Sequence, residues 1–330
     1  MKPLVSIITP CFNGEKFIDN YISNIIRQTY EAVEVIFIND GSTDRSEEMV
    51  LQKSYKIKDK NYSFIYCKQE NGGIAKAINS GLKLVTGEYI MLLDMDDVLY
   101  PDAIKAKADF LSQHEDYAMV RNNGYYTFEK HPKRKWKFDS SRVDGEEKEL
   151  FENLLLIKTY NWPGSYMVRS KHLFMNYPDR NIYISRYGQN LQFMLPLSYF
   201  YKTGFISDCL MEYYIRSESL SHSREMSKVL QTINGYENNR KEIVNKMKID
   251  SHEKGKYLRA IEKKYLTNGL RFSIRTNNRE LFHKQYLTLK QNNWLELKEW
   301  CLNILYRVKY FSFVYRVYCH FIFIINKTVI

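Results

Sequence analysis

Three acidic residues crowd the stretch LLDMDDVLYP, in which Asp94, Asp96 and Asp97 directly follow an apolar run. Carboxylates this close repel one another, so they need a cation, hydrogen-bond donors or open solvent around them. Alternate residues of an extended segment point the same way, so we expect Asp94 and Asp96 to share one face and Met95 to face away. Such a carboxylate pair suits Mg²⁺ or Mn²⁺, which would also bind phosphate oxygens of a substrate. The alternative is an acidic turn that only ends a strand.

Three further polar turns have the composition of strand-to-helix connections. They are PCFNGE (Pro10–Glu15), NDGSTD (Asn39–Asp44) and the Asn71-Gly72-Gly73 turn. Asp40 falls where a strand should end and can accept hydrogen bonds from a ligand, and Ser42 or Thr43 can cap the next helix. Taken alone, each turn is also what an ordinary chain reversal looks like.

Strands and helices alternate in the first third of the chain. Short apolar runs predict strands at 4–9, 33–38, 63–67 and 89–93, and helical spacing predicts helices at 15–27 and 74–85, with another opened by Pro101. This alternation predicts a mostly parallel sheet with helices on both faces. Ligands of such sheets bind at the carboxyl ends of the strands, so we expect PCFNGE, NDGSTD and DMDD to meet at one edge.

Roughly residues 3–111 carry a resemblance to the family-2 glycosyltransferases of GT-A fold. It rests on four stretches in this order: VSIITPCFNGEKFI, VEVIFINDGSTD, NGG and GEYIMLLDMDDVLYPDAI. The resemblance implies an α/β fold, a Rossmann-like mixed sheet flanked by helices, with a helical C-terminal extension. It implies that Thr9 and Asp40 lie at a uridine and that Asp94 and Asp96 are the metal-binding DxD pair. Asp96 would be the direct metal ligand, with Asp97 in support. The residues that it places at the nucleotide sugar are Thr9, Pro10, Asn13, Asp40, Asn71, Asp94 and Arg216.

Two later segments carry a looser resemblance to the same family. NWPGSYMVRSKHLF (Asn161–Phe174) resembles the acceptor-side strand and its following helix, and IRSESLSHS (Ile215–Ser223) resembles the loop that closes over the diphosphate. In that loop Arg216 offers a bidentate phosphate donor. His222 would complete the metal shell, although a lone histidine is as often incidental.

The chain departs from the family where an acidic pair normally supplies the catalytic base. The matching stretch is Gly188-Gln189-Asn190, and neither amide can accept a proton at neutral pH. It resembles a branch of bacterial polysaccharide glycosyltransferases that have GQN at this point. Gln189 and Asn190 would then hold the acceptor, and the base is left unassigned among the candidates Asp179, Asp208 and Glu212.

The bulk composition is that of a globular protein with anionic partners. The 330 residues are 44% hydrophobic and 26% charged, with a formal net charge of +11. Five scattered cysteines and no signal-peptide pattern predict a reduced, cytoplasmic protein. The basic run His131–Phe138 has no nucleic-acid-binding motif around it, so we expect a solvated loop there, or contact with an acceptor phosphate, and no nucleic-acid partner.

Two regions are expected, a glycosyltransferase domain at 1–220 and a helical region at 221–330, with helices at 226–248, 252–267 and 278–290. The tail 306–330 is aromatic and basic, and its uncharged run is too short to span a bilayer. Two interpretations stay open for it: an interfacial segment on anionic lipid, or a helix that packs on its own domain.

The resemblance implies a metal-dependent, inverting transfer of a hexosyl or N-acetylhexosaminyl group from a nucleotide sugar, with UDP the expected nucleotide. The implied acceptor is a glycan or a lipid-diphosphate-linked glycan in cell-surface polysaccharide assembly, at the inner face of the plasma membrane. Two alternatives remain: a related domain that only binds sugar nucleotide, and a nucleotidyltransferase, for which PCFNGEKF lacks the Gly-rich basic loop.

Overall fold

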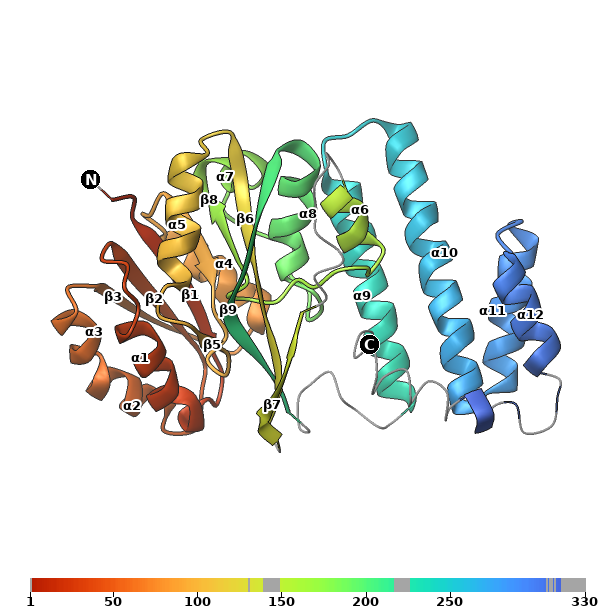
Figure 1. Ribbon diagram of the computed structural model, residues 1–330, viewed down its shortest axis with the longest axis horizontal. Coiled ribbons are helices and arrows are strands. Elements are labelled where there is room, and N and C mark those ends of the chain that lie inside the picture. The colour runs from red at the N-terminus through yellow and green to blue at the C-terminus, as the bar shows by residue number, and fades with distance from the viewer. Residues whose placement is uncertain are drawn as a thin grey trace. The chain divides into compact units, whose positions relative to one another are not determined.

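The computed structural model describes residues 2–129, 131–138, 149–216, 226–306, 308, 311 and 313–315. The chain divides into two compact units, Met1–Met247 and Lys248–Ile330. The first unit is a sheet covered by helices, and the second consists of helices (Figure 1).

Four parallel strands form the first half of the sheet, in the order β3 (Ser63–Gln69), β2 (Val33–Asp40), β1 (Val5–Cys11), β4 (Tyr89–Leu92). The four predicted strands are therefore confirmed. β2 is buried along its whole length, as expected of a parallel strand covered on both faces.

Helices cover both faces of this half. They are the 3₁₀ turn η1 (Glu15–Phe17), α1 (Ile18–Ile26), α2 (Ser46–Lys53), α3 (Tyr55–Asp59) and α4 (Ile74–Leu84). Neighbouring residues of β1 point to opposite faces: Ile7 joins the core beneath α1, and Ile8 lies against Gly81 of α4.

The second half of the sheet is mixed rather than parallel. It continues from β4 through β8 (Tyr166–Arg169), β6 (Tyr117–Phe128), β9 (Lys202–Ile215) and β5 (Val98–Leu99), with β7 (His131–Lys137) paired to β6. β8 runs antiparallel to both β4 and β6. The basic run expected to form a solvated loop is instead β7, antiparallel to β6, with most of its side chains in solvent.

The remaining helices of the first unit are α5 (Ala103–Gln113), α6 (Glu149–Leu155), α7 (Ser170–Asn176), α8 (Asn190–Phe200) and α9 (Met226–Lys246). α5 begins after Pro101, with Asp102 as its N-cap residue. α9, assigned from the sequence to the C-terminal region, lies in the first unit because it packs on α8 and its preceding loop. Asn239 donates to the Gly188 carbonyl at 3.0 Å, and Tyr236 packs against Tyr187.

The second unit contains α10 (Ser251–Thr276), α11 (Arg279–Gln291) and α12 (Leu297–Tyr306). α10 is longer than the helix predicted at 252–267 and ends at Asn277, which is left-handed. The side chains of the core are Leu270, Ile274, Phe282, Leu289 and Tyr306. Within the described part of the chain, none of the helices combines the length and the apolar character needed to cross a bilayer.

Candidate functional site

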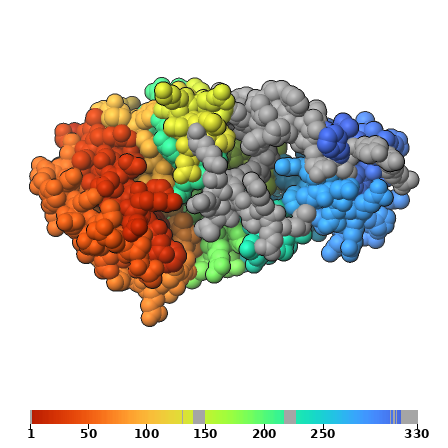
Figure 2. Space-filling view, turned by 90° about the horizontal axis from the view of Figure 1, so that it is seen from below, coloured from red at the N-terminus to blue at the C-terminus, as the bar shows by residue number. Residues whose placement is uncertain are grey.

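The loops that follow β1 and β2 are bound to one another at the carboxyl edge of the sheet. The backbone amide of Asn13 donates to Ser42 Oγ at 3.0 Å, and Asn13 Oδ1 accepts from the Thr43 amide at 2.8 Å. The Glu15 amide donates to Asp44 Oδ2 at 3.0 Å. The prediction that Ser42 or Thr43 caps the next helix is wrong: the N-cap residue of α2 is Arg45, and Ser42 is turned toward the β1 loop instead. Figure 2 shows the molecule from this side, with the N-terminal third (red to orange) as a continuous surface.

The acidic loop after β4 joins the same edge through Met95. A Cβ at Gly14 would lie 2.0 Å from Met95 Cε, so the end of the Met95 side chain occupies the space that a side chain at position 14 would need. Met95 is buried and points away from the solvent, as predicted. The extended conformation predicted for the segment is wrong, because residues 95 and 96 form a turn in which the Asp97 amide donates to the Asp94 carbonyl at 3.3 Å. Asp94 and Asp96 are nevertheless both partly open to solvent.

Two aspartates of this loop, Asp94 and Asp97, have raised pKa values. Burial, and then the charge of Asp96, raise the pKa of Asp94 to about 7. Burial and both neighbouring charges raise the pKa of Asp97 well above its usual value. Asp97 Oδ1 accepts from the Tyr214 amide at 3.3 Å, while its Oδ2 is buried without a hydrogen-bond partner among the described residues.

These observations fit a divalent cation, whose charge would relieve the repulsion among the carboxylates. Among the described residues, no three His, Cys, Asp or Glu side chains form a complete metal site on their own. A cation held by Asp94 and Asp96 would therefore share its shell with other oxygens, as a substrate diphosphate can provide.

Arg216, the residue after β9, lies beside this acidic loop as expected. Its guanidinium forms an ion pair with Asp96 Oδ2 and lies 4.5 Å from the centre of the Phe17 ring. The structure thus brings together two residues that are 120 positions apart. His222, the other predicted residue of the late loop, lies outside the described residues.

Asp40 binds the chain's own glycine turn. Its carboxylate accepts from the Gly72 amide at 2.9 Å, the Gly73 amide at 2.8 Å and Gln69 Nε2 at 2.6 Å. The turn also needs Gly41, because a Cβ there would lie 2.7 Å from the Asn71 backbone nitrogen. Asn71 itself is exposed. Asp40 therefore shapes this part of the edge whether or not it also contacts a nucleobase.

Thr9 and Pro10 differ in solvent exposure although they are adjacent in β1. Pro10 is partly exposed near the strand end. Thr9 is completely buried, and its hydroxyl lies close enough to Tyr21 of α1 to influence the pKa of that phenol. The side chain of Thr9 thus belongs to the core beneath α1 rather than to the open edge.

One tyrosine, Tyr166, interacts with both the GQN stretch and the acidic loop. Asn190 is the first residue of α8, and its Oδ1 accepts from the Tyr166 hydroxyl at 2.8 Å. Tyr166 is fully buried, and its pKa is raised first by burial and then by the charge of Asp94. Gln189 is partly exposed at the helix N-terminus, after Gly188, whose φ of +65° favours glycine.

None of the candidate bases is placed to receive a proton at the acidic loop. Asp179 is exposed next to Arg180, which binds carbonyls at the C-terminal end of α4 and hence at the opposite edge of the sheet. Asp208 is exposed on β9, six residues before Tyr214 and so roughly 20 Å away along the strand.

Glu212, the third candidate, is buried but accepts hydrogen bonds from Tyr100, Thr127 and Lys135. These three donors hold its pKa below the usual value despite the opposing effect of burial. A carboxylate stabilised in this way is a weak base, so Glu212 has a structural part in joining β5, β6, β7 and β9.

Two aromatic residues that were not singled out in the sequence lie beside the acidic loop. Trp162 stacks on Tyr213 with 4.2 Å between ring centres and 20° between ring planes. Burial raises the pKa of Tyr213, and the charges of Asp97, Asp94 and Asp96 raise it further, so the phenol lies within their field. In the sequence, the one signal for this position was that Trp162 falls in the segment Asn161–Phe174, which resembles the acceptor side of the family.

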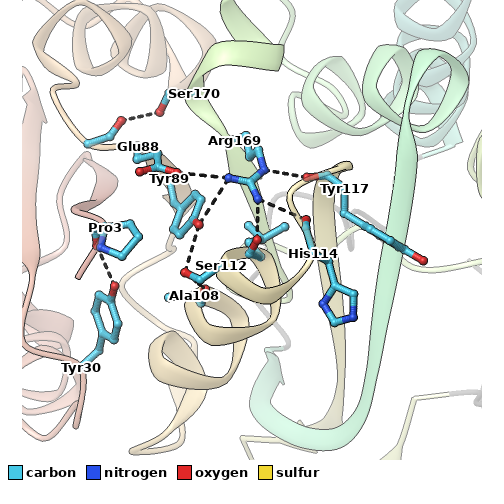
Figure 3. Close-up of polar contacts among 12 residues, drawn as sticks. Pro3, Tyr30, Glu88, Tyr89, Ala108, Ser112, His114, Tyr117, Arg169 and Ser170 are labelled. Atoms are coloured by element: carbon cyan, nitrogen blue, oxygen red, sulfur yellow. Dashed lines mark hydrogen bonds and ion pairs between the residues drawn. The ribbon is translucent and has the colours of Figure 1, made fainter. Parts of the chain in front are cut away.

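A cavity of about 420 Å³ lies at the other edge of the sheet, and it includes Pro3, Glu88 and Arg169 in its lining. Figure 3 shows that Arg169 is fully engaged there: it donates to the carbonyls of Tyr117, Leu111 and His114 and pairs with Glu88. A guanidinium with so many internal partners ties α5, β4 and β8 together and is not free for a ligand.

A family model described as glycosyl transferase family 2 matches residues 6–181, which is more than half of the chain. The chain belongs to this family. It is 37% identical over 124 residues to an uncharacterized glycosyltransferase of Rickettsia typhi, covering 38% of this chain and 37% of that one. It is 32% identical over 124 residues to glycosyltransferase GlyA of Streptococcus pneumoniae, covering 38% of this chain and 17% of that one. The chain thus spans well under half the length of these relatives.

Solved structures of similar fold extend over nearly the whole chain. Residues 1–349 of Staphylococcus aureus TarS, solved with UDP-GlcNAc, have a TM-score of 0.59 at 16% identity and cover 95% of this chain and 88% of that one. The mannosyltransferase PcManGT of Pyrobaculum calidifontis, solved with GDP-Man and Mn²⁺, has a TM-score of 0.56 at 14% identity and covers 99% of this chain and 89% of that one. This family-2 chain therefore has the GT-A fold, as the resemblance implied.

Proposed function

We propose that the protein transfers a sugar from a nucleotide-sugar donor to a hydroxyl of a glycan acceptor. The observation that carries the proposal is the joining of three loops at one sheet edge, where Arg216 pairs with Asp96 of the acidic loop. Family membership supports the reaction class, and the similar structures solved with UDP-GlcNAc and GDP-Man support a nucleotide-sugar donor. We favour UDP as the nucleotide, because the family resemblance implies that Asp40 lies at a uridine.

The donor's diphosphate would lie between the acidic loop and Arg216. Mn²⁺ or Mg²⁺ held by Asp94 and Asp96 would neutralise charge on the departing nucleotide. Arg216 is bound to Asp96 in this structure, and it is the described cation best placed to donate to phosphate oxygens at this point.

The acceptor would approach from the side of Asn190 and Trp162. With Tyr166 donating to its Oδ1, the Asn190 amide is oriented so that its Nδ2 can donate to a sugar oxygen. The acceptor oxygen would displace the nucleotide in line and invert the anomeric carbon. We propose a glycan or lipid-diphosphate-linked glycan of the cell surface as acceptor, reached from the cytoplasmic face of the membrane.

The test is Asp96→Asn, with Asp116→Asn as the matched control. Asp116 is an exposed acid paired with Lys202, so both changes remove one charge and one ion pair. We expect Asp96→Asn to abolish Mn²⁺-dependent transfer and the Mn²⁺-dependent thermal shift with UDP-sugars, and Asp116→Asn to keep both. Full transfer by Asp96→Asn, or by the wild type in excess EDTA, would end the metal-dependent mechanism.

One observation favours a second function, binding of sugar nucleotide without catalysis: an amide occupies the position of the usual family acid. Release of UDP from a UDP-sugar, measured with and without acceptor, separates the two functions. A pure binder shows a thermal shift with the donor and no release.

A further inference from the structure

The net charge of the protein is concentrated in its second unit. Residues 248–330 contain 16 Lys and Arg and 6 Asp and Glu, a formal charge of +10 out of +11 for the whole chain. The first unit, three times as long, is left with +1. The basic character that pointed to anionic partners is therefore a property of the helical unit and not of the catalytic sheet.

An apolar stripe runs along the exposed face of α12. Leu297, Trp300 and Ile304 recur at helical spacing on α12, Val308 lies two residues beyond the end of the helix, and the four are 74%, 52%, 45% and 58% exposed. Monomeric proteins rarely leave several large apolar side chains exposed side by side unless something covers them. Blue surface of this part of the chain is visible in Figure 2.

The core of the second unit uses the opposite face of the same helix. Tyr306 is buried and lies 4.4 Å from Phe282 between ring centres, and Glu299 is also buried. At 100° per residue these two positions lie about half a turn away from the stripe. The stripe is therefore not the face that holds α12 to α10 and α11.

We infer that this stripe, Leu297, Trp300, Ile304 and Val308, docks the second unit on an anionic lipid surface. A tryptophan among aliphatic side chains suits the boundary between headgroups and acyl chains, and the unit's charge of +10 suits an anionic leaflet. A second copy of this unit is disfavoured as the occupant, since two such charges would repel at close range. Exposed cations stand on the neighbouring helix α11 and on α12 itself: Arg279, Lys284, Lys290 and Lys298.

The inference gives a defined surface to the membrane association proposed above. It is tested by binding to vesicles and not by activity, so a failure of this inference can be distinguished from a failure of the proposed transfer reaction.

The experiment is sedimentation of the full chain with vesicles of phosphatidylglycerol and phosphatidylcholine, and with vesicles of phosphatidylcholine alone. We expect binding to the anionic vesicles that is weakened but not abolished by salt, since only the charge contribution is screened. Ile304→Glu should weaken it by about tenfold or more, because it places a charge within the apolar stripe. The matched control is Leu51→Glu, the same kind of change on exposed helix α2 of the first unit, where Leu51 is 45% exposed. It should bind as the wild type does.

Trp300 supplies a second measurement. The difference in fluorescence between wild type and Trp300→Phe should shift to the blue on addition of anionic vesicles and lose its quenching by acrylamide. Three results would overturn the inference: no wild-type binding to the anionic vesicles, equal binding by Ile304→Glu, or a Trp300 signal already shielded in the free protein. A wild-type dimer that Ile304→Glu dissociates would assign the stripe to a second copy instead.

Discussion

At the scale of single residues, Asp40 shows how one carboxylate can shape a binding edge before any ligand arrives. Its oxygens accept two backbone amides and one side-chain amide, all from the segment Gln69–Gly73. Bonds to a charged acceptor contribute about 1.5–3 kcal/mol each, which is enough to hold a glycine turn that has little else to fix it.

We therefore expect two effects from Asp40→Ala. The affinity for UDP should fall roughly ten- to hundredfold, with or without Mn²⁺, because both a ligand acceptor and the shape of the turn are lost. The free energy of unfolding should fall by about 3 kcal/mol or more, because all three bonds to the Asp40 carboxylate are lost. Calorimetric titration with UDP and urea unfolding measure the two. A loss of stability with unchanged UDP affinity would leave Asp40 a purely structural residue.

Tyr166 is a positioning residue for Asn190. Tyr166→Phe keeps the buried ring but leaves the Asn190 amide without the donor that orients it. We expect transfer to fall by about fivefold and donor affinity to stay within a factor of two, since a neutral hydrogen bond is worth about 1 kcal/mol.

The matched control is Tyr177→Phe, which removes another buried hydroxyl bonded to α8, at the Gln192 carbonyl, 2.8 Å away. It should lower stability by a similar amount and leave the acceptor KM unchanged. If both variants transfer equally well, Asn190 has no part in holding the acceptor.

At the scale of secondary-structure elements, α5 is joined to β6 by a buried lysine. Lys107 is fully buried and donates to Asn122 Oδ1 at 2.7 Å. Burial lowers its pKa from 10.5 to about 7. Between these two values the unfolded chain binds more protons than the folded one, so stability should rise with pH across that window and the penalty should be complete below about pH 7.

Lys107→Met should remove this dependence. The wild type should gain stability from pH 7 toward pH 9 at up to roughly 1.4 kcal/mol per unit, and the variant should show a flatter curve and higher stability at pH 7. Lys105→Met, on the same helix but exposed and paired with Asp109, is the control that should keep the wild-type slope. Equal slopes for wild type and Lys107→Met in urea unfolding would show that Lys107 is hydrated in solution.

At the scale of the whole molecule, the predicted interfacial tail overlaps the core of the second unit. Tyr306 belongs to that core, and residues 316–330 lie outside the described residues. The predicted interfacial tail 306–330 therefore begins with a residue that serves the fold, because its ring packs on Phe282 and its hydroxyl lies 3.5 Å from Asn277 Oδ1.

Two truncations should separate these parts. Ending the chain after Asn303 removes Tyr306 and should cost about 3 kcal/mol or more of stability in the second unit. Ending it after Tyr315 keeps the described core and the α12 stripe, and removes the cations Arg316 and Lys327. This shorter truncation should still bind anionic vesicles, at lower affinity and with less sensitivity to salt. Circular dichroism melts and vesicle sedimentation are the measurements, and complete loss of vesicle binding after Tyr315 would transfer the docking function to residues 316–330.

Much of the carboxyl edge of the sheet was predictable from the sequence because its signals are local. Apolar runs of strand length give buried strands, and parallel strands necessarily place their carboxyl ends together. This is why the loops at Asn13, Asp40 and Asp94 could be assigned to one edge, and the structure confirms their joining. The motif resemblance gave the family from the same local stretches.

Other features depended on which surfaces pack together, and periodicity does not encode that. The ion pair of Arg216 with Asp96 and the bond of Tyr166 to Asn190 join segments far apart in the chain. A turn at residues 95 and 96 replaces the predicted extension, and in it Met95 packs against Gly14 of the β1 loop, a contact between segments far apart in the chain. Thr9 is withdrawn from the edge because α1 covers its side of β1.

By itself, then, the sequence determined the alternating strands and helices, the edge at which they place their acidic loop, and the family. Only the tertiary structure decided which side chains are free at that edge, that α9 belongs with the sheet, and that nearly all the net positive charge falls within a separate helical unit. The physical reason is that strand and helix formation follow from residues a few positions apart. Burial, pairing and the boundary between the two units follow from contacts that form only when distant segments meet.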